Sequence, residues 1–522
     1  MPDENVAAIP SRAGSVAVSV LFADPSRGLG EEAPAPACFR DLNLDQIVAA
    51  AMAPKPDYRL VPIFHTALAD IEDIRYRQAV FRDAERLEVR AALDAFAEGM
   101  QALRANRAQI DKVRYKLEQQ AWFLDGVLLY DAAVRGFVEA FTAVELHSAG
   151  LGAFRDYLAA YAGSSRFTAL AAAAAGLKRD LAAISYCVYL IGSHVHVAPQ
   201  KSQPDFAEEV LDVFSKFKQA DAKDHSVKLP DRGAMNHIEA SILDLVAQLY
   251  PETFGRLDAF ATAEADFMDT TIATFDREVQ FYLAWLDHVA PVRRQGLPFC
   301  YPEVSDGKAV HGEAVFDLAL AHKLAGQGDT VVTNDFALVG SERIVVVTGP
   351  NQGGKTTFAR MLGQLHYLAA LGCPVPGRSA TLHLFDRIFT HFERPEIATS
   401  ERSKLEDDLL RMRDILGLAT PASLVILNEI FTSTTLADAV WLSREVMTRL
   451  VDLDVLAVWV TFIDELASFG DTVVSMVGGV DPLDTALRTF QLERRPADGL
   501  AYAMALAERH GLTYRILKER IP

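Results

Sequence analysis

The sequence contains little cysteine. Its four cysteines, Cys38, Cys187, Cys300 and Cys373, lie far apart and form no CxxC pair in the 522 residues. This spacing indicates neither a zinc site nor a disulfide framework, so a reducing, cytoplasmic environment is expected. Residues 1–20 also lack the basic start and the long apolar stretch that a secretory signal requires.

A long uncharged apolar run is missing as well. The most apolar segment begins at Phe167, but Lys178, Arg179 and Asp180 interrupt it. A membrane-spanning helix needs about 20 consecutive apolar residues, and charges inside it are costly. We therefore expect a protein with no membrane-spanning segment.

The sequence has fewer basic than acidic residues. The chain has 51 Lys and Arg against 70 Asp and Glu, and its net charge is −19. This counts against a general nucleic-acid coat protein, which binds phosphates through excess Lys and Arg, but it leaves a local basic surface open. Half of the residues are apolar, which indicates a globular chain long enough for two to four domains.

The pattern along the chain predicts a multidomain protein, with a mainly α-helical region followed by an α/β domain. Residues 1–41 are rich in Ala, Pro, Gly and Ser, which favours a poorly ordered or extended lead-in. Helical periodicity prevails over 42–296, with a small strand-containing insertion near 184–232. From 297 to 522, short apolar strands alternate with helices, as is typical of a largely parallel buried sheet.

One long amphipathic helix is expected over residues 88–124, where apolar residues recur in steps of three and four. A basic set lies on the same expected helix: Arg104, Arg107, Lys112, Arg114 and Lys116. These side chains could contact phosphates, although solvated faces of long helices commonly look the same. His194 and His196 alternate on an expected strand and could bind a metal ion. No third ligand is evident in the sequence, so a half-exposed strand is the favoured interpretation.

A glycine-rich loop is the strongest signal in the sequence. It matches GxxxxGK[ST], with an apolar strand expected at 344–347 before it and a helix expected at about 355–371 after it. Backbone N–H groups of such a loop surround phosphates, and the helix N-terminus adds partial positive charge. ATP is therefore the predicted ligand. The predicted binding residues are Gly349, Pro350, Asn351, Gln352, Gly353, Gly354, Lys355, Thr356 and Thr357.

The loop predicts a site for Mg²⁺ beside the phosphates. Lys355 should reach the outer phosphates, and the hydroxyl of Thr356 should ligate the ion. P-loop enzymes often end a neighbouring strand with an acidic residue that helps to hold Mg²⁺, followed by a glutamate. In the apolar stretch at 424–428 this metal position is Asn428, and Glu429 follows it. Glu429 is the predicted catalytic base, and the alternative is a solvated residue at a strand end.

Asn428 weakens the predicted metal site without removing it. An asparagine oxygen can accept a hydrogen bond, but it brings no negative charge to the ion. Losing an outer partner of this kind costs about 10- to 100-fold in metal affinity or activity. Slow hydrolysis is expected.

The stretch TGPNQGGKTT closely resembles the TGPNxGGK(S/T)T loop of the MutS family of DNA mismatch-repair ATPases, a branch of the ABC-type ATPases. The resemblance covers roughly residues 45–522 and is strongest over 297–522. Further similar segments follow in the family's order: NDFAL, FDRIFTHF, ERSKLEDDLLRMRDIL, SLVILNEIFTSTTLADAVWLS and RPADGLAYAMALAERHGL. In the helical region, PIFHTALADIEDIRYRQAVFRDA and FYLAWLDHVA resemble the family's core and lever segments.

The resemblance implies an ATPase, converting ATP and water to ADP and phosphate, that acts as a homodimer and clamps DNA. Ser403 matches the signature serine, which contacts the γ-phosphate of the opposite subunit in this class, so it joins Lys355 and Glu429 as a predicted catalytic residue. The alternative is a plain helix cap, because Glu406 stands three residues later. The letters Phe-x-Glu of the family's mismatch wedge occur at 96–98. They lie inside an expected helix, so a shortened MutS-like protein without a mismatch-reading domain is expected.

Three departures bear on the active site, besides Asn428 at the metal position. The family's GRG has become Phe431-Thr432-Ser433, and Phe462 replaces the usual switch histidine. The aromatic that stacks on adenine in some relatives would fall near Val331. These departures keep open a second hypothesis, a nucleotide-dependent dimerising scaffold with little or no hydrolysis. A transporter-type or SMC-like ABC ATPase is set aside, because no LSGGQ-like signature is present.

Overall fold

The computed structural model describes residues 16–28, 30, 32–192, 194–200, 235–393, 403–481, 487–497, 514 and 518. The chain divides into two compact units. The helical unit takes in Glu88–Glu145 and Ala153–Asp276, together with the chain up to Ala17, and the sheet unit takes in Val18–Leu87, Leu146–Gly152 and Arg277–Pro522. The change of unit thus falls after Asp276, inside a helix, and not near residue 297 where the sequence pattern changes.

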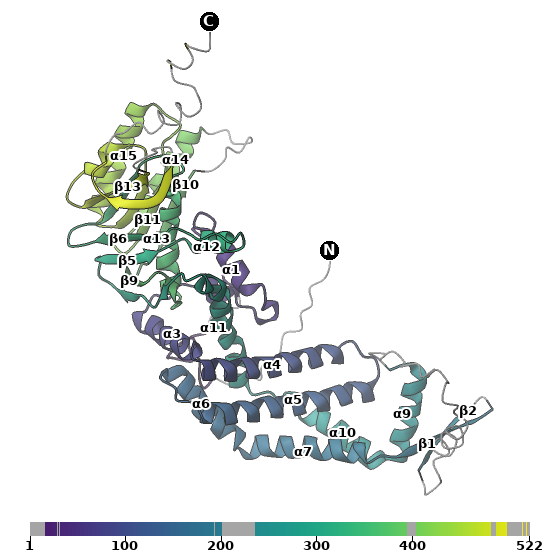
Figure 1. The fold of residues 1–522 in the computed structure, drawn as a ribbon. Helices are drawn as coiled ribbons and strands as arrows, with labels where there is room; N and C mark the ends of the chain where they lie inside the picture. Colours follow the sequence, from purple (N-terminus) through teal and green to yellow (C-terminus); the bar gives the residue numbers. More distant parts are fainter. Residues whose placement is uncertain are drawn as a thin grey trace, which may run out of the picture. The chain divides into compact units, whose positions relative to one another are not determined.

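Long helices that pack side by side make up the helical unit (Figure 1). They are α4 (Leu87–Ile110), α5 (Lys116–Thr142), α6 (Ala149–Ala162), α7 (Ser165–Ala182), α9 (His237–Leu249), α10 (Pro251–Ala263) and the first part of α11 (Thr270–Arg294). Aromatic rings fill the core between them. The ring of Phe96 stacks on that of Phe137 with centroids 4.5 Å apart. Phe96 is therefore an ordinary core residue of α4, as its place on the apolar face predicts.

The prediction of a single long helix over residues 88–124 is wrong. Helix α4 ends at Ile110 and α5 begins at Lys116, so the chain reverses between them. The reversal lets α4 and α5 pack closely, since a Cβ on Gly99 would lie 3.0 Å from Cβ of Ala133. Val113 is buried in the connection, and its carbonyl accepts a hydrogen bond of 2.9 Å from Gln119 Nε2. This tertiary packing outweighs the helical periodicity.

The expected basic set therefore does not lie on one helix. Arg104 and Arg107 belong to α4, Lys112 and Arg114 lie in the connection, and Lys116 begins α5. Several of these side chains already have acidic or other partners. Arg104 forms an ion pair with the buried Asp276, and Lys116 Nζ lies 2.5 Å from Asp258 Oδ1. Lys112 and Arg114 are exposed.

The expected strand-containing insertion is an antiparallel hairpin, β1 (Tyr186–Ile191) and β2 (His194–Pro199). His194 and His196 both lie on β2 and are exposed. In the part of the chain that the structure describes, no three His, Cys, Asp or Glu residues gather in a way that could hold a metal ion. The residues that follow the hairpin, 201–234, lie outside the described ones.

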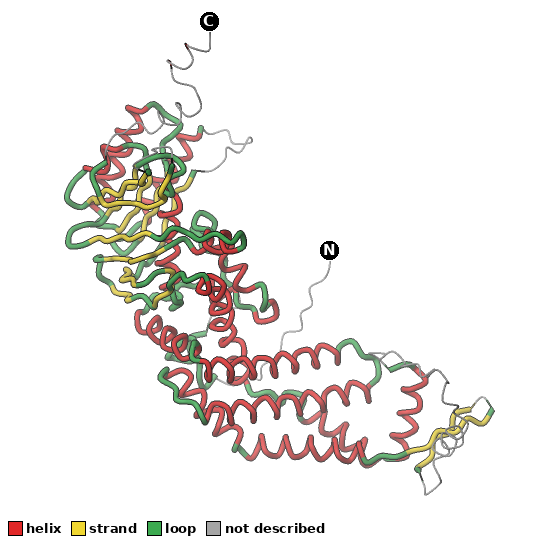
Figure 2. The backbone as a smooth tube through the Cα atoms, in the orientation of Figure 1, coloured by secondary structure: helices red, strands yellow, loops and turns green. Residues whose placement is uncertain are grey.

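The sheet unit is built on a six-stranded sheet with the order β10-β11-β12-β7-β13-β14. The first five strands are parallel, and β14 pairs antiparallel with β13 at the edge. Figure 2 shows the strands of the sheet unit in yellow and the helices in red. The strand bounds are β10 (Ile388–Phe392), β11 (Leu424–Asn428), β12 (Leu456–Val460), β7 (Ile344–Thr348), β13 (Val473–Val480) and β14 (Arg488–Arg494). The predicted parallel buried sheet is thus confirmed, and the chain has the predicted mainly helical region followed by an α/β region.

A second, four-stranded sheet has the order β4-β9-β5-β6. Its strands are β4 (Glu303–Ser305), β9 (Ser379–His383), β5 (Val310–Val315) and β6 (Asn334–Leu338). A short pair, β3 (Phe299–Cys300) with β8 (Val375–Pro376), accompanies it. The first residue of β6, Asn334, contacts β14 of the larger sheet through hydrogen bonds to Phe490 and Leu492.

Helices cover both faces of the six-stranded sheet, so its inner strands β11, β12 and β7 are buried along their whole length. On one face lies α13 (Lys355–Ala370), where a Cβ on Gly363 would come within 2.8 Å of Ile426 Cδ1. On the other lie α14 (Lys404–Leu418) and α15 (Leu436–Asp452). Their side chains share a core with Val425, Leu427 and Trp459.

In the described part of the expected lead-in, residues 16–41, the side chains of Val20, Leu21, Cys38 and Phe39 are buried. Among the described residues, the sheet unit also contains the α-helices α1 (Leu44–Met52), α2 (Val61–His65), α3 (Ile71–Ala84) and α12 (Leu318–Ala325).

Helix α11 carries the FYLAWLDHVA segment and continues from the helical unit into the sheet unit. Its residues from Phe281 to Leu286 are buried on every side of the helix. Trp285 Nε1 donates a 3.2 Å hydrogen bond to the carbonyl of Pro374. No helix in the described ranges is both long and apolar enough to span a bilayer.

Arg77 of α3 links the lead-in segment to the residue that follows α13. Its fully buried guanidinium donates to the carbonyls of Leu21 (3.1 Å) and Leu371 (3.2 Å). Because two buried carbonyls would lose a charged donor, we expect Arg77→Ala to lower the free energy of unfolding by about 3 kcal/mol. The measurement is urea unfolding followed by tryptophan fluorescence.

Arg75, on the same helix, provides the matched control. Its side chain is exposed and forms an ion pair of 2.7 Å with Glu72, three residues earlier on the helix. Arg75→Ala should change stability by less than about 0.5 kcal/mol. Equal effects of the two substitutions would contradict the role assigned to Arg77.

Candidate functional site

The phosphate loop connects β7 to α13 and depends on glycine at two positions. Gly349 has φ +112° and Gly354 has φ +89°, conformations that side chains with a Cβ rarely adopt. A Cβ on Gly349 would also lie 2.8 Å from the backbone nitrogen of Gly478 in β13. The loop therefore curls back tightly over the sheet edge and ends at the first residue of α13.

Lys355 is folded into this loop. Its Nζ donates to the carbonyls of Gly349 (3.0 Å) and Pro350 (3.2 Å) and to Asn351 Oδ1 (3.3 Å). Burial lowers the pKa of Lys355, and the carboxylate of Glu429, 3.8 Å away, partly opposes that shift. The loop thus surrounds a buried ammonium group, which suits it to compensate an anion that enters the loop.

The hydroxyl of Thr356 meets the end of strand β11. Thr356 Oγ1 donates a 2.8 Å hydrogen bond to Oδ1 of the buried Asn428. Strands β7 and β11 are both parallel members of one sheet, with β12 between them, so their carboxyl ends open on the same edge. This topology is the reason that residues 72 positions apart come into contact.

The turn after β11 is held in a strained conformation. Glu429 has φ +54° and Phe431 has φ +62°, and neither is glycine. Such residues cost about 1–3 kcal/mol each and persist only where the surroundings enforce them. Here Phe431 is completely buried in the core beneath α14 and α15, and the Glu429 N–H donates 2.9 Å to the carbonyl of Val460. The Glu429 carboxylate is consequently fixed beside the loop and stays partly exposed.

The residues after β12 lie next to this turn. Thr461 is buried, its N–H donates 3.0 Å to the carbonyl of Val347, and its Oγ1 accepts from Ile463 N at 3.0 Å. Phe462 is half exposed. A phenyl ring cannot donate a hydrogen bond, so Phe462 cannot act toward a phosphate as a histidine would.

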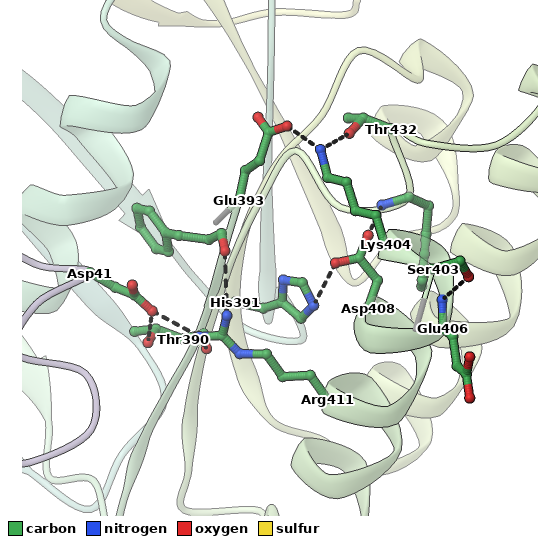
Figure 3. A network of polar contacts seen from close by, with 12 residues as sticks. Asp41, Thr390, His391, Glu393, Ser403, Lys404, Glu406, Asp408, Arg411 and Thr432 are labelled. Carbon is green, nitrogen blue, oxygen red and sulfur yellow. Dashed lines mark hydrogen bonds and ion pairs between the residues drawn. The ribbon is translucent and has the colours of Figure 1, made fainter. Parts of the chain in front are cut away.

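Helix α14 brings its own polar contacts to the same edge (Figure 3). Ser403 is the N-cap residue of α14, and its hydroxyl accepts from Glu406 N at 3.2 Å. Lys404 forms an ion pair with Glu393 at the end of β10, and its Nζ lies 3.4 Å from Thr432 Oγ1. The Ser403 hydroxyl is thus engaged as a helix cap and not with the loop.

Asp408 joins α14 to the turn that carries Glu429. Its Oδ2 accepts from the N–H of Phe431 at 3.4 Å, and its Oδ1 lies 3.4 Å from His391 Nε2 on β10 (Figure 3). Burial raises the pKa of Asp408 and lowers the pKa of His391 to about 4. His391 is therefore neutral at neutral pH, and the contact is not a full ion pair.

Asp41 is a further member of this network, although it comes from the expected lead-in. Its Oδ2 accepts from Thr390 Oγ1 (2.7 Å) and from Arg411 Nη2 (2.9 Å) (Figure 3). Arg411 belongs to α14 and also donates 2.6 Å to the carbonyl of Thr390. The N-terminal segment, β10 and α14 are thereby joined through one carboxylate that the sequence does not mark.

The edge strand β14 also reaches the loop. Arg488 Nε donates 3.2 Å to the carbonyl of Asn351. Its charge adds to the lowering of the Lys355 pKa, after burial. Val331, near which the adenine-stacking residue of some relatives would fall, is buried and aliphatic, so it provides no ring for stacking.

The donor set suits a metal–phosphate ligand. Thr356 and Asn428 provide uncharged oxygens in mutual contact, and the Glu429 carboxylate follows one residue later. Hydroxyl, amide and carboxylate oxygens are the ligands that Mg²⁺ prefers. The arrangement defines the class: a P-loop nucleotide-binding domain with a parallel sheet and a carboxylate beside the phosphate loop.

Comparison with known proteins finds similarity in the C-terminal part of the chain. Residues 345–508 match the family model for MutS domain V, an ATPase domain. The DNA mismatch repair protein MutS of Shouchella clausii is 31% identical over 190 residues, 35% of this chain and 22% of that protein. The MutS 2 protein of Halobacterium salinarum is 31% identical over 175 residues, 34% of this chain and 19% of that protein.

A third relative extends the match slightly. MutS of Chlorobaculum tepidum is 27% identical over 225 residues, 42% of this chain and 25% of that protein. The chain thus spans about a fifth to a quarter of the length of these relatives. Residues 345–508 thus match MutS domain V, an ATPase domain, and the chain is similar to these MutS proteins over about a third of its length.

The buried imidazole of His391 makes the stability of the sheet unit depend on pH. Its pKa is depressed to about 4 in the fold, chiefly by burial, whereas an unfolded histidine titrates near 6.5. The unfolded chain therefore binds the extra proton first, and stability should fall as pH drops from about 6.5 to 4 and stay level above 6.5. The measurement is urea unfolding across this pH range.

A variant without the imidazole isolates this contribution. His391→Leu should reduce the slope of stability against pH by up to about 1.4 kcal/mol per pH unit within that window. Other buried histidines, such as His366, whose pKa is also near 4, keep the remaining slope. Parallel curves for parent and variant would refute the assignment.

Proposed function

We propose that this protein is a MutS-like ATPase that binds ATP with Mg²⁺ and hydrolyses it slowly. The observation that carries the proposal is the meeting of the phosphate loop with the end of β11. Thr356 Oγ1 bonds to Asn428 Oδ1 at 2.8 Å, and Lys355 Nζ lies 3.8 Å from the Glu429 carboxylate. Phosphate binding and a candidate base are thus present in one place.

Each side chain has a separate task in this proposal. Loop N–H groups from Gly349 to Thr357 and the Lys355 ammonium bind the phosphates, and Thr356 and Asn428 would hold Mg²⁺. The bound ion would offset phosphate charge. Glu429 orients the attacking water and accepts its proton, for which its fixed turn and partly exposed carboxylate are suited.

A homodimer is part of the proposal. By its resemblance to the family's signature serine, Ser403 would contact the γ-phosphate bound by a second copy. Its present role as the cap of α14 is compatible with this, because a capping hydroxyl accepts a hydrogen bond from the helix and keeps its own proton to donate. Contacts of Lys404 and Asp408 with the turn would carry a movement of α14 to Glu429.

A nucleotide-dependent dimerising scaffold with little hydrolysis is the second candidate. Asn428 supports it, since its amide adds no negative charge next to the ion. Phe462 supports it too, since it cannot donate a hydrogen bond. Both candidates require ATP binding, so turnover separates them.

Steady-state ATP turnover with Mg²⁺ tests the ATPase. Glu429→Gln should lower kcat by about 100-fold or more, because an amide cannot accept the proton from water. Asn428→Asp should raise kcat by up to about tenfold, because a carboxylate adds charge to the metal site. Glu445→Gln makes the same chemical change at an exposed ion pair on α15 and should leave turnover unaltered.

The outcomes decide between the two candidates. Turnover by the parent that Glu429→Gln removes supports the ATPase. An inert parent that still binds ATP, with activity gained on Asn428→Asp, supports the scaffold. If the parent neither binds nor hydrolyses ATP, both candidates fail.

We also propose that DNA is the macromolecular ligand, on the strength of the similarity to MutS domain V and the names of the relatives. The exposed Lys112 and Arg114 are the side chains of the basic set best placed to meet phosphates. Each neutralised phosphate should contribute about 0.9 to the slope of log affinity against log salt. The double variant Lys112→Ala/Arg114→Ala should therefore flatten the slope measured with branched, mismatched and plain duplexes.

Lys178→Ala serves as the control for charge alone. Its Nζ lies 2.5 Å from Asp125 Oδ1, so it is already neutralised within the protein. This variant should bind with the parent's salt dependence. Negligible binding of the parent to all three DNA forms would rule out DNA as the ligand. An unchanged slope in the double variant would show that residues other than Lys112 and Arg114 contact the phosphates.

A further inference from the structure

The carboxylate of Asp41 lies at the outer edge of the six-stranded sheet, beside β10. Among the described residues β10 is the last strand on its side, so one edge of its backbone has no neighbouring strand. Arg411 of α14 covers this edge and donates to the carbonyls of Thr390 (2.6 Å) and Phe392 (3.3 Å). Asp41 Oδ2 accepts from Arg411 Nη2 at 2.9 Å and from Thr390 Oγ1 at 2.7 Å (Figure 3). The Asp41 side chain is 12% exposed, so solvent screens this charged contact only weakly.

The backbone around Asp41 is held on α13. The Asp41 carbonyl accepts 3.0 Å from Arg360 Nε, and the Leu42 carbonyl accepts 2.9 Å from Gln364 Nε2. Leu42 is fully buried against Gly363, where a Cβ would lie 2.6 Å from Leu42 Cδ2. The segment that carries Asp41 is therefore fixed to the helix that follows the phosphate loop.

Helices α13 and α14 cover opposite faces of the sheet, and each starts at a residue assigned to phosphate in the proposed function. Helix α13 begins at Lys355, and the N-cap residue of α14 is Ser403. Asp41 joins the two helices around the edge of β10. Its carbonyl contacts Arg360, in the second turn of α13, and its carboxylate contacts Arg411, in the third turn of α14.

The two contacts of Asp41 are made by different atoms. Any residue has a carbonyl that can accept from Arg360, whereas only the side chain reaches Arg411 and Thr390. Removing the carboxylate therefore releases α14 and leaves the contact with α13 in place. The phosphate loop at the start of α13 should keep its geometry when this is done.

We propose that Asp41 is a positioning residue, which holds α14 so that Ser403 fits the nucleotide bound by a second copy of the chain. The proposal rests on the ATPase and the homodimer proposed above. Asp41 acts through Arg411 and contacts no reacting group. A misplacement of about 1 Å can cost about 100-fold in rate. The loss should occur at the partner's site, because Ser403 serves the partner, and not at the site of the same chain.

ATP turnover and ATP binding, each with Mg²⁺, give the first test. Asp41→Ala should lower kcat by about 10- to 100-fold and leave the Kd for ATP from isothermal titration within about twofold of the parent's value. Asp41→Asn keeps an oxygen that can accept from Arg411, so it should lose less. Asp45→Ala removes an exposed carboxylate in the first turn of α1 and should match the parent. An unchanged kcat in Asp41→Ala would overturn the proposal.

Mixed dimers distinguish positioning of the partner's site from general damage. Asp41→Ala keeps its own Glu429, and Glu429→Gln keeps a correctly placed Ser403. In a dimer of the two variants, the Asp41→Ala subunit therefore has one complete site. Equal mixing of these two inactive proteins should restore roughly a quarter of the parent's rate, because half of the dimers are mixed and each has one complete site. Absence of restored turnover would count against the positioning role.

A second mixture should stay inactive. When Asp41→Ala is mixed with Ser403→Ala, one site receives an alanine and the other receives a misplaced serine. Restored turnover in this mixture would contradict the proposal, because it would show that Asp41 does not act through Ser403.

Ser403→Ala mixed with Glu429→Gln tests the proposed dimer without any change at Asp41. If this mixture regains turnover and Asp41→Ala with Glu429→Gln does not, only the role of Asp41 is wrong. If the parent turns over ATP but this mixture stays inactive, the contact of Ser403 with a second copy is wrong, and the role of Asp41 falls with it. A parent that does not turn over ATP would refute the proposed ATPase itself.

Discussion

The parallel sheet is the constraint on which the candidate site depends, because it places Thr356 next to Asn428. Parallel strands that are apolar on both faces have their carboxyl ends at one edge, so the loops that follow β7, β11 and β12 must converge there. Covering helices α13, α14 and α15 make this arrangement stable. The phosphate loop and the turn with Glu429 meet because the strands before them end at the same edge of the sheet.

Backbone strain is found in this region as well as elsewhere in the chain. Glu429, Phe431 and Phe490 all have positive φ without being glycine, and each is held by identifiable contacts. Phe431 is anchored by complete burial, and Phe490 by the amide of Asn334. Where the family pattern has a glycine, Phe431 combines the strained backbone with a core anchor. A turn fixed in this way holds the Glu429 backbone directly after Asn428 at the end of β11.

The N-terminal segment makes contacts that hold parts of the sheet unit together. Asp41 ties β10 to α14, and the fully buried Arg77 donates to the carbonyls of Leu21 and Leu371. Both residues bridge segments that are hundreds of positions apart in the chain. Position within the fold, and not local composition, gives this segment its order.

The sequence by itself determined the parallel sheet, the phosphate loop and the identity of Lys355, Thr356, Asn428 and Glu429 as its candidate residues. Apolar runs and glycine spacing are local signals, and a strand followed by a Gly-Lys-Thr helix start has few alternative structures. The break between α4 and α5, the packing of the N-terminal segment, the Asp408 contacts and the contacts of β14 with Asn334 were decided only by tertiary structure. Each depends on a partner distant in sequence, such as Ala133, Leu371, Phe431 or Asn334, and no local pattern specifies which distant residue will be opposite.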